Sequence, residues 1–298
     1  MMKKQPICNY ENSDYRTQFW EGQGREYEDL VERVALKRLV PARGSSLIEI
    51  GAGFGRLSNE YTGYDKVVLF DYSRSLLREA QAHLQHDPRY IFVAGNWYDM
   101  PFVSGAFDTI VQVRSLHHAT DPIAVFRQMA RIIQPRGDYI LEYANKLNMK
   151  AILRYSLKRQ NWSPFDKEPI EFAPLHYDFH PDWIRNQLQD VGFKVGEALS
   201  VSYFRVPLLK RTVPLKWLVG MDSLIQRTGR FGHLSPSVFV HNKAPDTGER
   251  APAGQFFACP SCATPLVERD ASRLDCPGCG LGWKCDQGLY DFKEPISD

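Results

Sequence analysis

The stretch SLIEIGAGFGRLSNEYTGYDKVVLFD, residues 46–71, joins two apolar runs through a loop that contains three glycines. Gly51, Gly53 and Gly55 alternate with single residues, and the second apolar run ends at Asp71. Glycines let a cofactor lie against bare backbone in a tight turn that opens a helix, and an acid after the next strand can bind a ribose diol. The pattern therefore predicts strand, glycine turn, helix and strand around a nucleotide-type cofactor.

The spacing of the glycines distinguishes two classes of cofactor. The dinucleotide fingerprint has its third glycine three residues after the second, and this chain has Arg56 there. Instead, Glu49 precedes the first glycine by two residues, so that residues 49–55 read E-I-G-A-G-F-G. In this motif the chain resembles the class I S-adenosylmethionine (SAM) dependent methyltransferases. A strand-turn-helix with incidental glycines is the plainer alternative.

The segments that follow alternate between strand and helix patterns. A short helix is expected at 56–61, a longer one from Ser73, and another at 123–133, where the apolar residues have a helical period. Strand-like runs lie at 90–93, 107–113 and 138–143. This alternation favours a doubly wound parallel α/β sheet of Rossmann-like type. Strands at 193–198 and 237–241 would complete it with an antiparallel last pair.

The resemblance covers residues 41–144 and implies roles for eight residues. Glu49 would orient the methionine end of SAM, the backbone of Gly51, Gly53 and Gly55 would lie under it, Asp71 and Tyr72 would hold the ribose, and Asn96 and Trp97 would hold the adenine. The family more often has Asp where this chain has Asn96. The amide oxygen of an asparagine can still accept the hydrogen bond from the adenine amino group.

The loop S-L-H-H-A-T-D-P at 115–122 resembles the loop that follows the fourth strand in this family. His117 and His118 stand where the methyl acceptor should enter. Either could act as a general base, but loop histidines of this kind more often line the pocket or cap the next helix. Methyl transfer mainly requires alignment and exclusion of water, and it needs a base only if the acceptor must lose a proton. The catalytic residues are therefore left unassigned.

Two insertions distinguish the chain from a minimal methyltransferase, and such insertions usually build the acceptor pocket. Residues 145–180 are expected to start with a basic amphipathic helix from Lys146 to Lys158, and residues 200–234 are rich in apolar and basic side chains. An N-terminal helix at 25–40 and the aromatic segment before it resemble the flap that related enzymes place over the cofactor. Simple packing of Phe19 and Trp20 into the core is an equal alternative.

The cysteines are concentrated near the end of the chain, since five of six follow residue 258. Cys259 and Cys262 form one C-x-x-C pair, and Cys276 and Cys279 form a second. Four thiolates at this spacing satisfy a structural tetrahedral Zn²⁺, with two disulfides as the alternative. The segment 256–292 resembles the small zinc-ribbon proteins that activate tRNA, rRNA and protein methyltransferases. Cys285, the fifth cysteine, is expected to be a buried apolar residue.

We therefore expect a methyltransferase domain at 1–242, a flexible linker at 243–255 and a zinc ribbon at 256–298.

The chain has a net charge of +2, yet the ribbon carries three more acids than bases. An acidic ribbon is better suited to dock on the basic residues before it than to bind RNA. No apolar stretch matches a signal peptide or a membrane span, which leads us to expect a cytoplasmic protein.

Three functions remain open after this reading. The favoured one is methylation of a small or amphipathic acceptor, with peripheral contact to a membrane surface through the basic insertions. The second is methylation of tRNA or rRNA, which would use the basic insertions and the ribbon. The third is a regulatory module that holds SAM without turnover. Methylation at cytosine C5 is excluded, because it needs a cysteine nucleophile and the catalytic half contains only Cys8.

Overall fold

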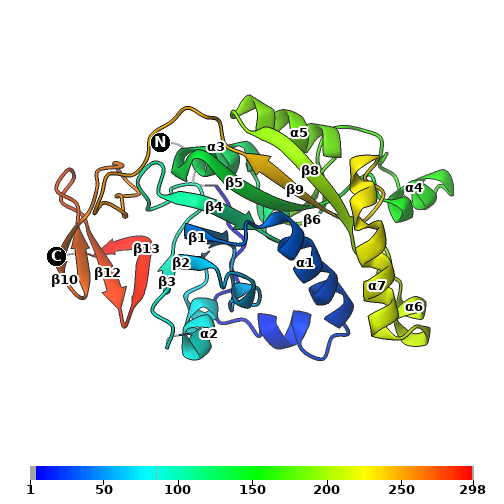
Figure 1. The fold of residues 1–298 in the computed structure, drawn as a ribbon, viewed down its shortest axis with the longest axis horizontal. Coiled ribbons are helices and arrows are strands. Elements are labelled where there is room, and N and C mark those ends of the chain that lie inside the picture. Colours follow the sequence, from blue (N-terminus) through cyan, green and yellow to red (C-terminus); the bar gives the residue numbers. More distant parts are fainter. Residues whose placement is uncertain (1–4, 85, 297–298) are drawn as a thin grey trace.

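One long sheet organises the computed structural model, which describes residues 5–84 and 86–296 (Figure 1). Within these residues the sheet has eleven strands in the order β10-β11-β12-β13-β3-β2-β1-β4-β5-β9-β8. The strands are β1 (Gly44–Ile50), β2 (Tyr64–Asp71), β3 (Tyr90–Ala94), β4 (Phe107–Gln112), β5 (Ile133–Ala144), β8 (Lys194–Val201), β9 (Ser237–Lys243), β10 (Val267–Asp270), β11 (Arg273–Asp275), β12 (Gly282–Asp286) and β13 (Leu289–Ile296). A separate hairpin is formed by β6 (Ile170–Ala173) and β7 (His176–Asp178).

The seven strands from β3 to β8 form a doubly wound sheet. β3, β2, β1, β4 and β5 pair in parallel, whereas β9 lies antiparallel between β5 and β8. This confirms the predicted Rossmann-like α/β fold with an antiparallel last strand. The order of the strands reverses between β1 and β4, which is where a sheet of this kind opens a crevice for a ligand.

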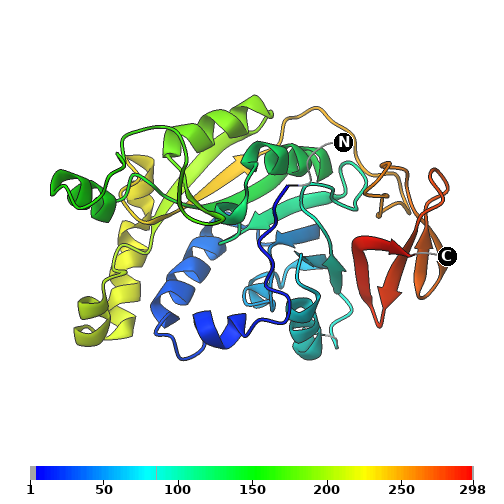
Figure 2. The same ribbon diagram turned by 180° about the vertical axis from the view of Figure 1, so that it is seen from behind.

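Helices cover both faces of this sheet (Figure 1, Figure 2). They are α1 (Glu26–Leu39), α2 (Arg74–Leu84), α3 (Pro122–Ile132), α4 (Met149–Ser156), α5 (Pro181–Asp190), α6 (Pro207–Thr212) and α7 (Leu215–Ile225), with single turns η1 (Arg16–Trp20), η2 (Ser58–Glu60), η3 (Leu116–His118) and η4 (Gln226–Arg230). Residues of α1, α2 and α7 form one buried core, and residues of α3 and α5 form the other. Because successive strand residues point to opposite faces, each central strand contributes to both cores.

Two helices predicted from the sequence are shorter in the structure. The helix expected at 56–61 is reduced to the 3₁₀ turn η2, because the N–H groups of Ser58, Glu60 and Tyr61 donate to carbonyl oxygens three rather than four residues earlier. The expected basic helix from Lys146 to Lys158 is reduced to α4, which starts at Met149 after an Asn148 cap. Lys146 is instead buried and donates to the carbonyl oxygen of Glu168 at 2.7 Å.

No helix among the described residues is long and apolar enough to cross a membrane. The outermost residues of the two predicted domains, 1–4 and 297–298, lie outside the described residues. The domain boundaries themselves stay a prediction.

The cysteine-rich tail extends the central sheet rather than standing apart from it (Figure 1). Its last strand, β13, pairs in parallel with β3, so that Tyr290 lies beside Val93. The guanidinium of Arg74 on α2 binds the carboxylate of Asp291 on β13, with 2.6 Å from Nε to Oδ2. Ahead of the tail strands, Phe257 forms an isolated bridge with Phe102.

Residues 243–255, which precede the tail, are bound to the predicted methyltransferase domain by backbone hydrogen bonds. The N–H group of Ala244 donates to the carbonyl oxygen of Gly137 at 2.9 Å, and that of Ala251 donates to the carbonyl oxygen of Gly105 at 3.1 Å. Gly105 has φ +64°, and a Cβ there would lie 2.0 Å from the carbonyl oxygen of Glu249. The chain therefore passes this point in close contact with the domain.

The aromatic packing between tail and sheet predicts a measurable cost. Phe292 of β13 is 4% exposed and its ring packs on those of Phe257 and Trp283. We expect Phe292→Ala to destabilise the docked tail by about 3 kcal/mol, as is usual when a buried phenylalanine is truncated. Faster hydrogen exchange of the β3 amides, which β13 covers, would report it.

The matched control for this variant is Phe231→Ala, which removes a phenylalanine that is 88% exposed. It should change the free energy of unfolding by less than about 0.5 kcal/mol. Equal exchange in β3 for Phe292→Ala and wild type would show that the tail does not depend on this contact.

Candidate functional site

The glycine loop after β1 has a backbone that only glycine adopts easily. Gly51, Gly53 and Gly55 have φ values of +72°, +54° and +75°. A Cβ on Gly51 would lie 2.5 Å from the Cβ of Ser115, and a Cβ on Gly55 would press on Ala80 at 3.2 Å. Gly51 therefore lets the loop after β4 approach β1, and Gly55 lets α2 pack beneath the loop.

Asp71 fixes this loop from the end of the neighbouring strand β2. Its two carboxylate oxygens accept hydrogen bonds from the backbone N–H groups of Gly53 and Ser73, each at 2.8 Å. Burial raises the pKa of Asp71 above its usual range, and these backbone hydrogen bonds act in the opposite direction. One carboxylate thus holds the turn after β1 and the start of α2 in register.

A pocket opens at this point, between the carboxyl ends of the strands. It is lined by Ile7, Cys8, Tyr10, Tyr15, Gly51, Gly53, Phe70, Asp71, Tyr72, Leu76, Gly95, Trp97, Arg114, Ser115 and His118. Of the residues proposed from the sequence, two loop glycines, the ribose pair, Trp97 and His118 thus come together. Glu49, Gly55, Asn96 and His117 lie outside this lining.

Asn96 and Trp97 present different groups after β3. The amide oxygen of Asn96 accepts from the N–H of Tyr98 at 3.0 Å, and its amide nitrogen lies 3.3 Å from Asp99. The Asn96 side chain is therefore engaged within its own turn. The indole Nε1 of Trp97 is buried with no hydrogen-bond partner among the described residues. A buried donor of this kind is costly unless a ligand or water satisfies it.

Glu49 lies beneath the glycine loop rather than in the pocket. It is buried, and its Oε2 has no hydrogen-bond partner within the described part of the chain. Burial raises the pKa of Glu49 to about 7, against the attraction of Arg56. A cationic ligand group nearby would favour the ionised form.

A buried ionic network joins α1 to both loops. The carboxylate of Glu32 binds Arg56 of the glycine loop and Arg114 of the loop after β4, each at 2.7 Å. Burial alone would raise the pKa of Glu32, but the two guanidinium charges outweigh it and keep the carboxylate ionised. The ring of Trp20 lies 3.8 Å from the Arg56 guanidinium carbon. Residues of η1 and α1 thereby clamp the two loops that frame the pocket.

The N-terminal segment runs across the central strands in the view of Figure 2, and its residues reach the pocket. Cys8, Tyr10 and Tyr15 line this pocket, and the Tyr10 hydroxyl lies 3.2 Å from Nε2 of His118. Cys8 thus lies near the cofactor site after all, but burial raises the pKa of its thiol, which disfavours the thiolate that a C5 nucleophile needs.

Of the residues from which the resemblance implies a flap, Tyr10 and Tyr15 line the pocket and those of α1 do not. Trp20 is buried, as the alternative expects, whereas Phe19 is 40% exposed. The individual contacts of the N-terminal segment could not be read from the sequence, where only the aromatic content of residues 10–20 hinted at them.

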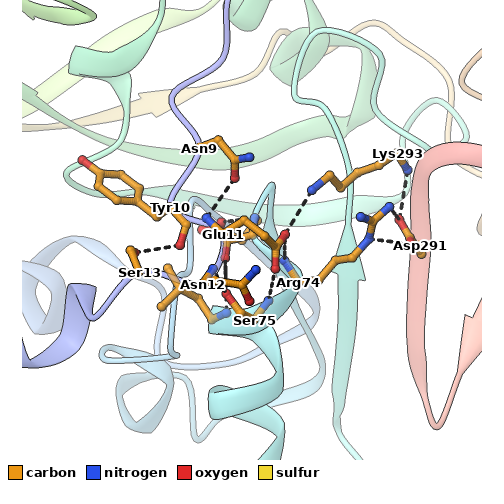
Figure 3. A network of polar contacts seen from close by, with 12 residues as sticks. Asn9, Tyr10, Glu11, Asn12, Ser13, Arg74, Ser75, Asp291 and Lys293 are labelled. Atoms are coloured by element: carbon orange, nitrogen blue, oxygen red, sulfur yellow. Dashed lines mark hydrogen bonds and ion pairs between the residues drawn. The ribbon is translucent and has the colours of Figure 1, made fainter.

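Glu11 anchors this segment to α2 and to the tail (Figure 3). Its carboxylate accepts from the N–H groups of Arg74 and Ser75 at 3.0 and 2.8 Å, and from Nζ of Lys293 at 3.2 Å. An acid at a helix N-terminus satisfies orphan N–H groups and favours the helix dipole. Because Lys293 belongs to β13, one carboxylate connects the covering segment, the cofactor-side helix and the tail.

Two further lining residues were not singled out from the sequence. Arg114 takes a left-handed backbone conformation, with φ +53°, while its N–H donates to Glu142 at 2.8 Å. Non-glycine residues in this region are often found at functional sites. The Ser115 hydroxyl donates to the carbonyl of Ile50 at 3.1 Å. The small side chain of Ser115 leaves room for the backbone of Gly51, which passes close to it.

The two histidines of η3 are neutral in this environment. Burial lowers the pKa of His118 to about 4, although the hydrogen bond to the carbonyl of Leu175 opposes that shift. Burial lowers the pKa of His117 well below its usual range, helped by the charge of Arg114. A base with so low a pKa removes a proton poorly at neutral pH, so neither imidazole is well poised as a general base.

The pocket fits SAM in three respects. Gly51 and Gly53 contribute to its lining, the Asp71 carboxylate borders it, and the unpartnered Trp97 indole lies beside it. Tyr10, Tyr15 and Tyr72 also line the pocket. The ammonium of Lys293 lies over the Tyr72 ring, 4.1 Å from its centroid, so aromatic rings at this site already hold one cation.

Comparison with known proteins gives the same class. Residues 48–141 match the family model Methyltransf_11, described as a methyltransferase domain. A demethylmenaquinone methyltransferase of Lactococcus lactis is 28% identical over 115 residues, which cover 37% of this chain and 46% of that protein. A sterol 24-C-methyltransferase of Schizosaccharomyces pombe is 29% identical over 99 residues, which cover 32% and 26%. The chain spans about half or less of the length of these curated relatives.

A solved structure shows the fold across more of the chain. It comes from the complex between the Haloferax volcanii Trm112 methyltransferase activator and the putative methyltransferase. It superposes with a TM-score of 0.53 at 18% identity, covering 78% of this chain and 98% of that one. With the family match, the fold and the glycine loop, residues 48–141 form a class I SAM-dependent methyltransferase domain.

Four cysteine sulfurs gather at the tip of the tail. Cys259 lies 3.7 Å from Cys279, Cys262 lies 3.3 Å from Cys276, and all four sulfurs fall within 4.8 Å of one another. Sulfurs held at ~2.3 Å by a tetrahedral zinc would be about 3.8 Å apart. The four thiols therefore fit a structural Zn²⁺. Cys285 is buried and stands apart from this group, as predicted.

These positions predict one zinc per chain on the cysteine cluster, in protein purified without added metal. Cys276→Ser should lose that zinc and unfold the tail, since the tail strands enclose little core of their own. Elemental analysis and the hydrogen exchange of β10–β13 would measure both effects.

Cys285→Ser is the matched control, because it changes a buried cysteine of the same tail outside the cluster. It should retain the metal. A metal-free wild type, or a disulfide at Cys259 under reducing conditions, would contradict the zinc assignment.

Proposed function

We propose that this protein is a SAM-dependent methyltransferase that acts on a small amphipathic acceptor. The main support for SAM as the cofactor is the position of Asp71. Its carboxylate accepts a hydrogen bond from the glycine loop and also lines the pocket. When bound, SAM supplies an activated methyl group for in-line displacement. The protein's own residues then orient the cofactor and exclude water: Asp71 the ribose, the loop glycines the methionine end, and the N-terminal segment the solvent.

Space for an acceptor lies between α1 and the second insertion. A cavity of 490 Å³ is lined there by Tyr27, Arg205, Lys210 and Leu218, among others. Its volume falls within the usual range for small-molecule sites. Burial lowers the pKa of Arg205, as does the charge of Arg114, which itself lines the cofactor pocket. Arg205 lines this cavity and Arg114 lines the cofactor pocket, and the two guanidinium charges act on each other.

The lining and the surface of the second insertion favour an amphipathic acceptor with an acidic group. Apolar walls and cationic side chains occur together in the cavity. On α6 and α7, Leu208, Trp217 and Leu224 are 69, 69 and 81% exposed, which is unusual for large apolar side chains. The named relatives act on a demethylmenaquinone and on a sterol. We propose that this surface lets a lipophilic acceptor enter from an anionic membrane surface.

The tail is proposed to brace the methyltransferase domain rather than to grip nucleic acid. Its parallel strand β13 and the Glu11–Lys293 contact support a structural role beside the cofactor site. Its acidic balance opposes RNA. The exposed Lys150 and Arg154 of α4 leave methylation of RNA as the alternative to be tested.

The cofactor assignment is tested by Asp71→Asn. The two oxygens of Asp71 each accept one backbone N–H, from Gly53 and Ser73. In asparagine one of these oxygens becomes an NH₂ group, which only donates, so one of the two hydrogen bonds is lost. The loop should then be held less firmly, and SAM affinity should fall at least about tenfold. Isothermal titration would measure it. Asp65→Asn changes an exposed acid at the other end of the same strand and should leave SAM affinity unchanged. Binding of NAD without binding of SAM would refute the proposal.

The acceptor class is tested with SAM that carries a labelled methyl group. The protein would be incubated separately with a total lipid extract and with tRNA and rRNA, and we expect label in the lipid fraction. Label in RNA alone, abolished by charge reversal at Lys150 and Arg154, would overturn the amphipathic acceptor in favour of RNA. The same charge reversal should leave transfer to lipid intact.

A further inference from the structure

Three histidines from two distant parts of the chain meet beside the cofactor pocket. His117 and His118 belong to η3 after β4, and His176 opens β7 in the first insertion. One ring nitrogen of each lies within 4.8 Å of one nitrogen of the other two. The ring centroids are 4.0 Å apart for the first pair and 4.7 Å apart for His118 and His176. The sequence showed the first pair, but nothing local marked His176 as their partner.

Backbone carbonyls fix the tautomer of two of these rings. Nδ1 of His118 lies 2.9 Å from the carbonyl oxygen of Leu175, and Nδ1 of His176 lies 2.8 Å from that of Pro174. A carbonyl only accepts, so each Nδ1 must carry the proton and each Nε2 must present a lone pair. This is the arrangement that orients histidine ligands in metal sites, where the second nitrogen donates to a carbonyl or carboxylate.

The third ring, that of His117, also has a nitrogen lone pair free to bind a metal. His117 makes no hydrogen bond within the residues that the structure describes, and its ring faces the other two. The Tyr10 hydroxyl lies 3.2 Å from Nε2 of His118, at hydrogen-bond distance from the nitrogen that would bind the metal. A bound metal would therefore displace the Tyr10 hydroxyl, which belongs to the N-terminal segment.

The surroundings can accept a further positive charge. Arg114 and Arg205 lie near His117 and would repel a cation, but Glu32 pairs with Arg114 at 2.7 Å. Glu28 lies 3.8 Å from Arg205. Asp178, two residues beyond His176 on β7, adds another carboxylate near Arg205. The local acids thus offset the two guanidinium charges.

We propose that His117, His118 and His176 bind a divalent transition metal, with zinc as the best match. Three imidazole ligands and one open position are the ligand set of a catalytic zinc site. Nitrogens held at ~2.1 Å by such an ion lie about 3.4 Å apart. The nitrogens of the three rings lie within 4.8 Å of one another, so they need to close in by at most roughly 1.4 Å. This site is separate from the cysteine cluster of the tail.

His118 also lines the cofactor pocket, so a metal held by this ring would lie at the edge of that pocket. A metal there would coordinate an acceptor oxygen and lower its pKa, which removes the need for a protein base. This use of the metal rests on the proposed methyl transfer. The metal site itself does not.

Cobalt distinguishes the two sites in the full-length chain, since thiolate ligands give intense charge-transfer absorption that imidazole ligands lack. Metal-free wild type titrated with Co²⁺ should bind two ions per chain, one for each cluster. Cys276→Ser should lose the thiolate bands and keep the weaker imidazole-type spectrum. His176→Ala and His117→Asn should keep the thiolate bands and lose the second ion.

His83→Ala is the matched control, because His83 is exposed on α2 and bonds only within its own helix. It should still bind both ions. Binding of a single ion by wild type, or of two ions by both His176→Ala and His117→Asn, would overturn the inference. SAM titration of the same samples keeps the proposals separate: a second cobalt without SAM binding would leave the metal site standing and refute the methyltransferase function.

Discussion

The backbone conformation of the glycine loop is the constraint on which the site depends. Positive φ at three alternate residues turns the chain so that the N–H of Gly53 points at Asp71. The absence of a side chain at Gly51 brings Ser115 close, and with it the loop that carries Arg114 and η3. Any other residue at Gly51 would force apart the two strands between which the pocket opens.

Buried charge imposes a second constraint on the same region. Glu32 lies within the α1 layer and remains ionised only because Arg56 and Arg114 reach it from both loops. Removing one partner from a buried ion pair typically costs 3–5 kcal/mol, since the other charge is left uncompensated. Arg56 is the residue that excluded a dinucleotide fingerprint, and the structure gives it this separate structural task.

The sequence predicted what depends on local pattern. The glycine spacing, the alternation of strands and helices and the paired cysteines each lie within a short stretch, so the doubly wound sheet and the sulfur cluster followed from them, whereas the pairing of the tail with that sheet did not. What it missed depends on contacts between distant segments. Nothing near Glu11 shows that it will bind Ser75 and Lys293, and nothing near His176 shows that it will meet His118.

The helix errors have a local cause that pattern reading overlooks. A basic period from Lys146 onward resembles a helix face, yet Asn148 caps the helix two residues later and Lys146 is drawn inward by the carbonyl of Glu168. The roles of individual cofactor-site residues and the domain boundaries stay predictions. Asn96 illustrates why, because its side chain is already engaged within its own turn.

The pairing of β13 with β3 also determines which strands end the sheet. Without the tail, β3 would present a row of unpaired backbone groups, and such edges template association with other chains. With it, the outer strand becomes β10, which is four residues long, fully exposed, charged and interrupted by a bulge. The opposite outer strand, β8, also carries an irregularity in its register. The tail therefore replaces an edge strand that could pair with another chain by a short, charged and irregular one, which is the kind of edge that opposes such pairing.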